Sequence, residues 1–340
     1  MYTLSNVAKH HFSGTEDVYV LDLHRTSAGL AAITSDQQLT LLDPTQFGGG
    51  GPAASWQVEH GNVTTLRVFD ADNGLVCTAG EDGSVGVWDL RSRGPGARVA
   101  QFKAAAASIL SMACSPSTQT IAVGTELANH VASVHLWDVR STPSPKAEYQ
   151  EVHSDDVTTL RFHPSDPALL LSGSTDGLVN VYDTRQPDED EVTLQTLNHN
   201  ASIHDAGFLS ATEIFALSHD EHFALYDVSD ENPTGDASQT FGDLRETLGG
   251  GTQYVAGVTP KTDGSGAIIG AGSQDKQTFE LIFMARHPAE PSWVLDRGNS
   301  VSLPRAHGDE IVRSFCFFDD EKLVFTAGED GNIKAWRPGS

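Results

Sequence analysis

Short stretches of alternating hydrophobic and polar residues, separated by tight turns, run along the whole chain. The clearest example is the segment 153–183, HSDDVTTLRFHPSDPALLLSGSTDGLVNVYD. Within it the pattern predicts three strands, which contain Val157 to Phe162, Leu169 to Ser172 and Leu178 to Tyr182, with an Asp176-Gly177 turn between the last two. Strands this short and this regularly spaced favour an all-β fold made of several small sheets.

An internal period organises these strands, because an Asp recurs in six units, six residues before one fixed position in the third strand. Successive third-strand positions are 44 to 55 residues apart, which is typical of one propeller blade per unit and predicts a seven-bladed β-propeller. The pairs are Asp36 with Leu42, Asp82 with Trp88, Asp176 with Tyr182, Asp220 with Tyr226, Asp275 with Leu281 and Asp330 with Trp336, and Trp137 marks a unit without the Asp.

Three units carry a His, a Ser or Thr, an Asp and an aromatic residue at matched spacing. The sets are His60, Thr78, Asp82 and Trp88; His153, Ser172, Asp176 and Tyr182; and His307, Thr326, Asp330 and Trp336. They resemble the WD repeat (WD40), and this resemblance implies a buried hydrogen-bond network that joins strands to a turn. A catalytic triad has no reason to be repeated around a ring, so we expect no catalytic residue and no enzyme.

We interpret residues 1–340 as a single propeller domain, with blades at about 17–59, 60–103, 104–152, 153–197, 198–244, 245–304 and 305–340. The last unit shows only three strands, and the segment 4–12 is free to supply the fourth, so we expect an N-terminal strand to close the ring. Three further expectations concern connections. They are an outer strand at Trp56 to Glu59, a solvated loop at the acidic run Pro187 to Glu191, and a long connection at 286–300.

Several motifs also resemble the WD repeat-containing protein 89 family. They are HSDDVTTLRFHPSDP and SGSTDGLVNVYD in 153–183, AVGTE at 122–126, SHDEHF at 218–223, VRSFCFF at 312–318 and TAGEDGNIKAWRPG at 326–339. This resemblance implies a non-enzymatic propeller of the nucleus or cytoplasm. Separately, the segments Trp88 to Arg91 and Trp137 to Arg140 resemble the WDxR box of substrate receptors of cullin-type ubiquitin ligases.

Charge narrows the choice of partner, since 46 acidic residues against 21 basic ones give a formal net charge of −25. The chain has no basic stripe with interleaved aromatic residues, which argues against direct nucleic-acid binding and favours a basic protein partner. The alternative is that the acidity only keeps the protein soluble and monomeric. We expect a monomer on its own.

The same sequence favours an intracellular protein, nuclear or cytoplasmic. No apolar run approaches the length of a membrane helix, and the first residues lack the apolar core of a signal peptide. The cysteines Cys77, Cys114 and Cys316 are far apart in or beside predicted strands, which indicates core residues and no disulfide framework. The cluster His219 to His222 lies on one hairpin and no phosphate-binding loop is present, so we expect neither a metal nor a cofactor.

The repeat also predicts one binding face, because the residue before each turn Asp and the residues just after each network His should point to the same end of the ring. The predicted protein-binding face contains Asn62, Glu81, Asp155, Asp156, Thr175, His219, Gln274, Asp309 and Glu329. We therefore expect a protein-interaction scaffold, and more specifically an acidic escort for a basic protein such as a ribosomal protein or histone. The alternative is a substrate receptor of a cullin-type ubiquitin ligase, if Arg91 and Arg140 lie on the opposite face.

Overall fold

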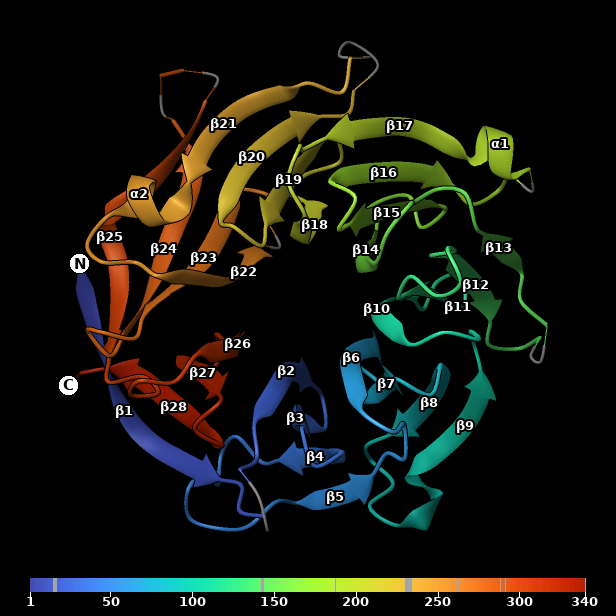
Figure 1. Cartoon of the computed structure of the whole chain (residues 1–340). Coiled ribbons are helices and arrows are strands. Elements are labelled where there is room, and N and C mark those ends of the chain that lie inside the picture. Colours follow the sequence, from blue (N-terminus) through green and yellow to red (C-terminus); the bar gives the residue numbers. More distant parts are fainter. Residues whose placement is uncertain are drawn as a thin grey trace.

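The structure is a ring of small β-sheets around a central channel (Figure 1). It is a computed structural model that describes residues 1–14, 17–141, 144–186, 188–229, 234–261, 263–287, 289–290 and 292–339. Each blade has four strands, the first next to the channel and the fourth at the rim, so the predicted all-β, seven-bladed propeller is confirmed. Among the described residues, no helix has the length and apolar character needed to cross a membrane.

The strands follow one order in every blade. The first blade contains β2 (Val20–Thr26), β3 (Gly29–Thr34), β4 (Gln38–Leu42) and β5 (Ala54–Gln57); the second contains β6 (Val63–Asp70), β7 (Leu75–Gly80), β8 (Ser84–Asp89) and β9 (Arg98–Lys103); the third contains β10 (Ile109–Ser115), β11 (Thr120–Thr125), β12 (Val134–Asp138) and β13 (Ala147–Tyr149); and the fourth contains β14 (Val157–Phe162), β15 (Leu169–Ser174), β16 (Leu178–Asp183) and β17 (Thr193–Asn198).

The remaining blades keep that order up to the closure. The fifth contains β18 (Ile203–Phe208), β19 (Glu213–Ser218), β20 (His222–Asp227) and β21 (Ala237–Asp243); the sixth contains β22 (Tyr254–Pro260), β23 (Gly266–Ser273), β24 (Thr278–Arg286) and β25 (Trp293–Pro304); and the seventh contains β26 (Val312–Phe318), β27 (Leu323–Gly328), β28 (Asn332–Pro338) and β1 (Tyr2–His11). Short helices occur at α1 (Glu189–Val192), α2 (Leu244–Leu248) and the 3₁₀ turn Pro95–Ala97.

The hydrophobic core lies between neighbouring blades rather than in one central mass. The second strands are buried on both faces, as in β3 and β11, where every residue is buried. Side chains on their alternate faces pack against the blade on either side, as a cluster of Cys77, Met112 and Trp137 does between the second and third blades. Each blade is therefore stabilised by two neighbours, which requires a closed ring.

The first strand of the chain closes this ring, as the sequence predicts. β1 pairs antiparallel with β28, from Leu4 opposite Pro338 to His11 opposite Asn332. It also pairs in parallel with β25 of the sixth blade, where Tyr2 is opposite Val301. The sixth and seventh blades are thereby joined through β1 into one sheet of eight strands.

Three local expectations are corrected by the structure. The acidic run is not a loop throughout, because residues from Glu189 form α1, which Asp188 caps by accepting from the backbone N–H of Asp190; Pro187 lies outside the described residues. The connection expected at 286–300 is strand from Trp293 onward, since β25 pairs with β24 there. The outer strand of the first blade is β5, which ends at Gln57 and not at Glu59.

Candidate protein-binding face

The fourth blade contains a continuous hydrogen-bond chain through its predicted network. Nδ1 of His153 lies 3.0 Å from Oδ2 of Asp176, and Nε2 lies 2.7 Å from Oγ of Ser172. The Ser172 hydroxyl lies 2.6 Å from the Tyr182 hydroxyl. Because a carboxylate only accepts, the Nδ1–H of His153 donates to Asp176 and Nε2 accepts from Ser172.

The seventh blade repeats this arrangement with an indole in place of the phenol. Nε1 of Trp336 donates to Oγ1 of Thr326 at 2.9 Å, Thr326 lies 2.8 Å from Nε2 of His307, and Nδ1 of His307 lies 2.5 Å from Oδ1 of Asp330. An indole N–H can only donate, so the direction of the whole chain is fixed. Burial lowers the pKa of His307, which keeps the imidazole neutral and supports the same tautomer.

The second blade includes a fifth member that the sequence analysis missed. Nδ1 of His60 lies 2.9 Å from Oγ of Ser84, and Ser84 in turn hydrogen-bonds both carboxylate oxygens of Asp82. Nε2 of His60 lies 2.8 Å from Thr78, which accepts from Trp88. Ser84 stands two residues after the turn Asp, at the position that Leu178 has in the fourth blade. A hydroxyl residue at this position could have predicted the fifth member of the network.

The other four blades hold their turns with different residues. In the fifth, His199 contacts the Tyr226 hydroxyl at 3.0 Å and not Ser218, which hydrogen-bonds Asp220. In the sixth, Oε1 of Gln253 accepts from the backbone N–H of Asp275 at 3.0 Å. The first blade retains only Thr34 donating to Asp36, and the third has a Ser133–His135 contact at 2.8 Å.

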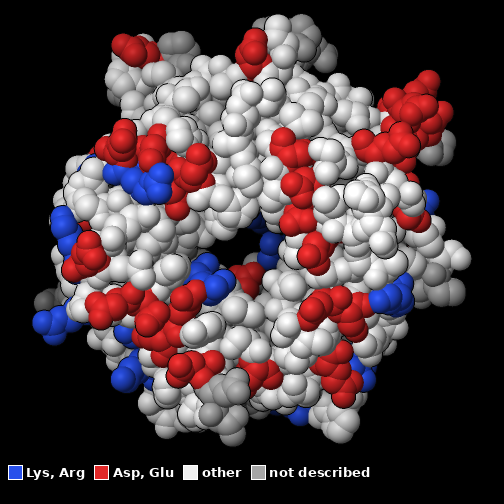
Figure 2. Space-filling view, viewed as in Figure 1, with Lys and Arg blue, Asp and Glu red and all other residues white. Residues whose placement is uncertain are grey.

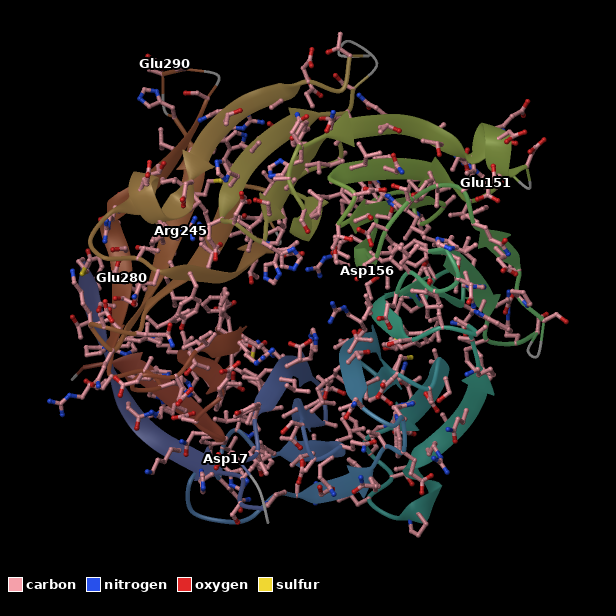
Figure 3. All side chains as sticks on the ribbon, viewed as in Figure 1. Asp17, Glu151, Asp156, Arg245, Glu280 and Glu290 are labelled. Carbon is pink, nitrogen blue, oxygen red and sulfur yellow. The ribbon has the colours of Figure 1, made fainter. Side chains whose placement is uncertain are left out.

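These networks bring the predicted face residues to one end of the ring, which we call the turn face. Nδ2 of Asn62 donates to Oε2 of Glu81 at 2.6 Å, and the backbone N–H of Thr175 donates to the carbonyl of Asp156. The same loop-to-turn pairing places His219 beside Ser202, Gln274 beside Asp309 and Glu329 beside Ile311. Figure 2 shows this face, with acidic side chains grouped around the channel opening and few basic ones. Asp156 lies at the edge of the opening (Figure 3).

The acidic side chains of the turn face differ in how far they are already neutralised. Glu329 forms an ion pair with Arg313, whose Nη2 lies 2.7 Å from Oε1. Asp156 accepts from the backbone N–H of Leu127 and Asp309 accepts from the Gln277 amide, so each keeps its charge and a second oxygen. Glu81 is paired only with the neutral Asn62. The available negative charge is therefore at Glu81, Asp155, Asp156 and Asp309 more than at Glu329.

The channel below this face is lined by charged pairs that sequence reasoning did not identify. A cavity of about 850 Å³ is bounded by the first strands of six blades. In its wall Oδ2 of Asp22 accepts from Arg67 at 3.1 Å and contacts His24 at 3.1 Å, and Arg161 pairs with Asp205 at 3.2 Å. Burial alone would raise the pKa of Asp22, but His24 and Arg67 hold that pKa well below its ordinary value.

The remaining residues singled out by the sequence analysis are the His219 to His222 cluster and the pair Arg91 and Arg140. The described residues include no group of three or more His, Cys, Asp or Glu side chains able to hold a metal ion. His219 and His222 of the candidate cluster separate, because His219 contacts Ser202 and His222 contacts Asp220 at 3.3 Å. Arg91 and Arg140 follow the far ends of their third strands, so they lie on the face opposite the turn face, where they pair with Asp89 and Asp138.

Comparison with known proteins agrees with this geometry. The family model of the WD domain, G-beta repeat, matches residues 54–89, 144–183 and 298–337. An uncharacterised WD repeat-containing protein of Saccharomyces cerevisiae is 33% identical over 314 residues, which is 91% of this chain and 75% of that protein. The chain therefore belongs to the WD repeat family, whose propellers generally act as protein-interaction scaffolds rather than enzymes.

More distant matches follow the same line. The WD repeat-containing protein 89 homolog of Dictyostelium discoideum is 28% identical over 329 residues, which is 95% of this chain and 84% of that protein. A chain in the crystal structure of a mitotic checkpoint complex superposes with a TM-score of 0.72 at 17% identity, covering 99% of this chain and 93% of that one, and this likeness shows the fold alone.

Proposed function

We propose that the protein is a non-enzymatic scaffold whose turn face binds a basic protein segment, and that it escorts a basic protein such as a ribosomal protein or histone. The observation that supports the proposal is that Glu81, Asp155, Asp156 and Asp309 come from three blades and belong to the loops and turns of the turn face, with Asp156 at the edge of the channel opening (Figure 3). Carboxylates gathered at such an opening concentrate negative potential and speed the capture of a Lys- and Arg-rich partner. Solubility alone requires no such convergence.

The location of this activity is part of the proposal. U3 small nucleolar RNA-associated protein 15 of Saccharomyces cerevisiae is 32% identical over 94 residues, which is 28% of this chain and 18% of that protein. We take this limited similarity to favour a nuclear site of action. The net charge of −25 argues against direct contact with the nucleic acid itself.

Paired charge reversals test the binding face. The full chain is first purified from the cells that naturally produce it, and the native partner is the protein recovered with it in stoichiometric amount. Binding is then measured with the purified pair. We expect Asp155→Lys with Asp156→Lys to weaken binding at least tenfold and to flatten its dependence on salt. The matched control is Asp190→Lys with Glu191→Lys, the same change of charge on the exposed surface of α1. Equal loss in both variants would mean that the charge acts diffusely and that the face is misassigned.

A ubiquitin-ligase substrate receptor is a second candidate, because Arg91 and Arg140 are exposed on the face opposite the turn face. An adaptor could dock there while a substrate occupies the turn face. Each guanidinium is already held by an Asp two residues earlier in the chain, with Nη2 2.9 Å from Asp89 and 2.6 Å from Asp138. Co-purification of a cullin adaptor that is lost in Arg91→Ala with Arg140→Ala would favour this function over an escort.

A further inference from the structure

Two cysteines that are far apart in the sequence meet between the second and third blades. Cys77 lies in β7, at the centre of the second blade, and Cys114 lies in β10, the channel strand of the third. Cys77 is a buried member of the hydrophobic cluster that joins these blades, Cys114 packs against the same cluster, and their strands β7 and β10 are in contact. Both cysteines are free.

The surroundings of the two thiols differ. Cys77 is fully buried, whereas Cys114 is partly exposed. The guanidinium of Arg67, which lines the channel, interacts electrostatically with Cys114 and donates to the carbonyl of the nearby Met112. Solvent access exposes the Cys114 thiol, rather than the Cys77 thiol, to a dissolved oxidant. The neighbouring Cys114 and burial both raise the pKa of the Cys77 thiol, which therefore stays protonated until its neighbour reacts.

We propose that Cys77 and Cys114 form a reversible disulfide across the second and third blades when the protein meets hydrogen peroxide. The Cys114 thiolate attacks one peroxide oxygen, the O–O bond breaks, and Cys114 becomes a sulfenic acid while hydroxide leaves. The Cys77 sulfur then attacks the Cys114 sulfur, the S–O bond breaks, and the departing hydroxide takes the Cys77 proton as water. Two thiols are oxidised and one peroxide is reduced to two waters. A thiol reductant such as glutathione restores both thiols by exchange.

The cross-link would connect two blades that are otherwise held together by packing and by hydrogen bonds such as that from Arg67 to Met112. β7 and β10 already approach each other closely in the reduced protein. A covalent bond at this place limits the separation of the second blade from the third without touching the turn face. The cysteine pair thus gives the ring a redox-dependent stiffness that is independent of the proposed basic partner.

The experiment exposes the folded full-length protein to a graded series of hydrogen peroxide, blocks remaining thiols with an alkylating agent, and digests it without reductant. We expect a peptide that links Cys77 to Cys114, and its loss on treatment with glutathione. In Cys77→Ala, we expect Cys114 to accumulate as a sulfenic acid that reacts with dimedone. In Cys114→Ala, we expect Cys77 to remain a thiol at the same peroxide levels. Unfolding in urea of the oxidised protein should show a higher midpoint than that of the reduced protein.

Cys316→Ala is the matched control, because Cys316 is also free and lines the channel but has no thiol neighbour among the described residues. Its peroxide response should equal that of the unmodified protein. Failure to link Cys77 with Cys114 while Cys316 is oxidised first would overturn the proposal. So would a link that forms only after the protein is unfolded, which circular dichroism recorded on the same samples distinguishes.

Discussion

Nδ1 of His153 lies 3.0 Å from Oδ2 of Asp176, and the pair joins the loop that enters the fourth blade to the turn between its second and third strands. The same carboxylate accepts from the backbone N–H groups of Ser154 and Leu178. Although burial alone would raise its pKa, these hydrogen bonds and His153 lower the pKa of Asp176. The blade thus depends on a carboxylate that remains ionised inside a mostly apolar unit.

Replacement of Asp176 by Ala should reduce the free energy of unfolding by ~1–3 kcal/mol, because His153 and two backbone donors lose their acceptor. Urea unfolding at neutral pH measures the loss. The pKa of Asp176 is lower in the folded state than in the unfolded state, so this stabilisation is fully present above the unfolded-state pKa. It is lost as the pH falls through the folded-state pKa. The free energies of unfolding of the variant and the native protein should therefore become equal in acid. Asp155→Ala on the neighbouring loop is the control. Unchanged stability with loss of partner binding in Asp176→Ala would show that the residue belongs to the binding face.

Leu4 of the closing strand predicts a second effect on stability. Its side chain is buried with Trp336, Leu281 and Leu303, where the sixth and seventh blades meet. Leu4→Ala should lower the free energy of unfolding by ~2–4 kcal/mol, because it leaves a cavity at the point of ring closure. Val7 lies on the same strand but is 53% exposed, so Val7→Ala should change stability by less than ~0.5 kcal/mol. Equal midpoints of thermal unfolding for the two variants would contradict a closing role for β1.

Glu221 predicts an unusual pH dependence. It stands at the turn position that is glycine in the second, fourth and seventh blades, with φ at 65°, and its carboxyl is buried. Oε1 accepts from the backbone N–H of Val255, and Oε2 has no hydrogen-bond partner among the residues that the structure describes. Burial raises the pKa of Glu221 to about 7. Because the folded state then holds the proton more tightly than the unfolded state, this carboxyl makes stability fall as the pH rises from about 4.5 to about 7.

Glu221→Gln removes that ionisation and keeps an acceptor for Val255. We expect the variant to be more stable than the native protein by roughly 1–3 kcal/mol at pH 8 and close to it at pH 5, measured by urea unfolding at both values. Glu246→Gln on the surface of α2 is the control and should show no such difference. If the difference in free energy of unfolding between Glu221→Gln and the native protein is the same at pH 5 and pH 8, the carboxyl is solvated.

Arg67 in the channel wall gives a fourth prediction. Arg67→Met leaves Asp22, whose side chain is 23% exposed, without its guanidinium partner and should lower the free energy of unfolding by about 1–2 kcal/mol. Arg25→Met is the control, because Arg25 pairs with Asp320, whose side chain is 84% exposed, and such a pair contributes ~0–1 kcal/mol. Adding Asp22→Asn to Arg67→Met should recover part of the loss. A double-mutant cycle without coupling would show that the pair is solvated and contributes little.

The sequence predicts the fold of this protein better than its surface. The Asp that recurs before the third strand of six blades is local information, because the turn between the second and third strands fixes its place, and from it the ring and the network of His307 and Trp336 could be predicted. Contacts between blades could not be predicted, since the distance between Asp22 and Arg67 is set by how the first and second blades pack against each other. Even there a signal existed, because Arg67 and Arg161 stand at the same position, four residues after the first residue of β6 and of β14.

The irregular segments could not be predicted from the sequence for a different reason. β25 was expected as a connection because it has no alternation, and its start is fixed by tertiary contacts of Trp293, whose Nε1 donates to Glu213 of the fifth blade. Gln253 stands 22 residues before Asp275, the same spacing that separates His60 from Asp82. Its Oε1 accepts from the backbone N–H of Asp275, whereas a network His contacts the Asp carboxylate. The position could therefore be predicted from the spacing, and the change of hydrogen-bond partner could not.

The pairing of β1 with both β28 and β25 has a consequence for how the protein folds during translation. During synthesis β1 emerges before the other strands of the propeller, and both of its partners are among the last of those strands. For most of translation the strand has no edge to join, and six blades can stack before the circle is complete. Closure then joins residues from opposite ends of the chain, a contact of very high sequence separation that forms slowly. Until that step the nascent protein carries an open strand edge, and this interval is when it most needs protection from self-association.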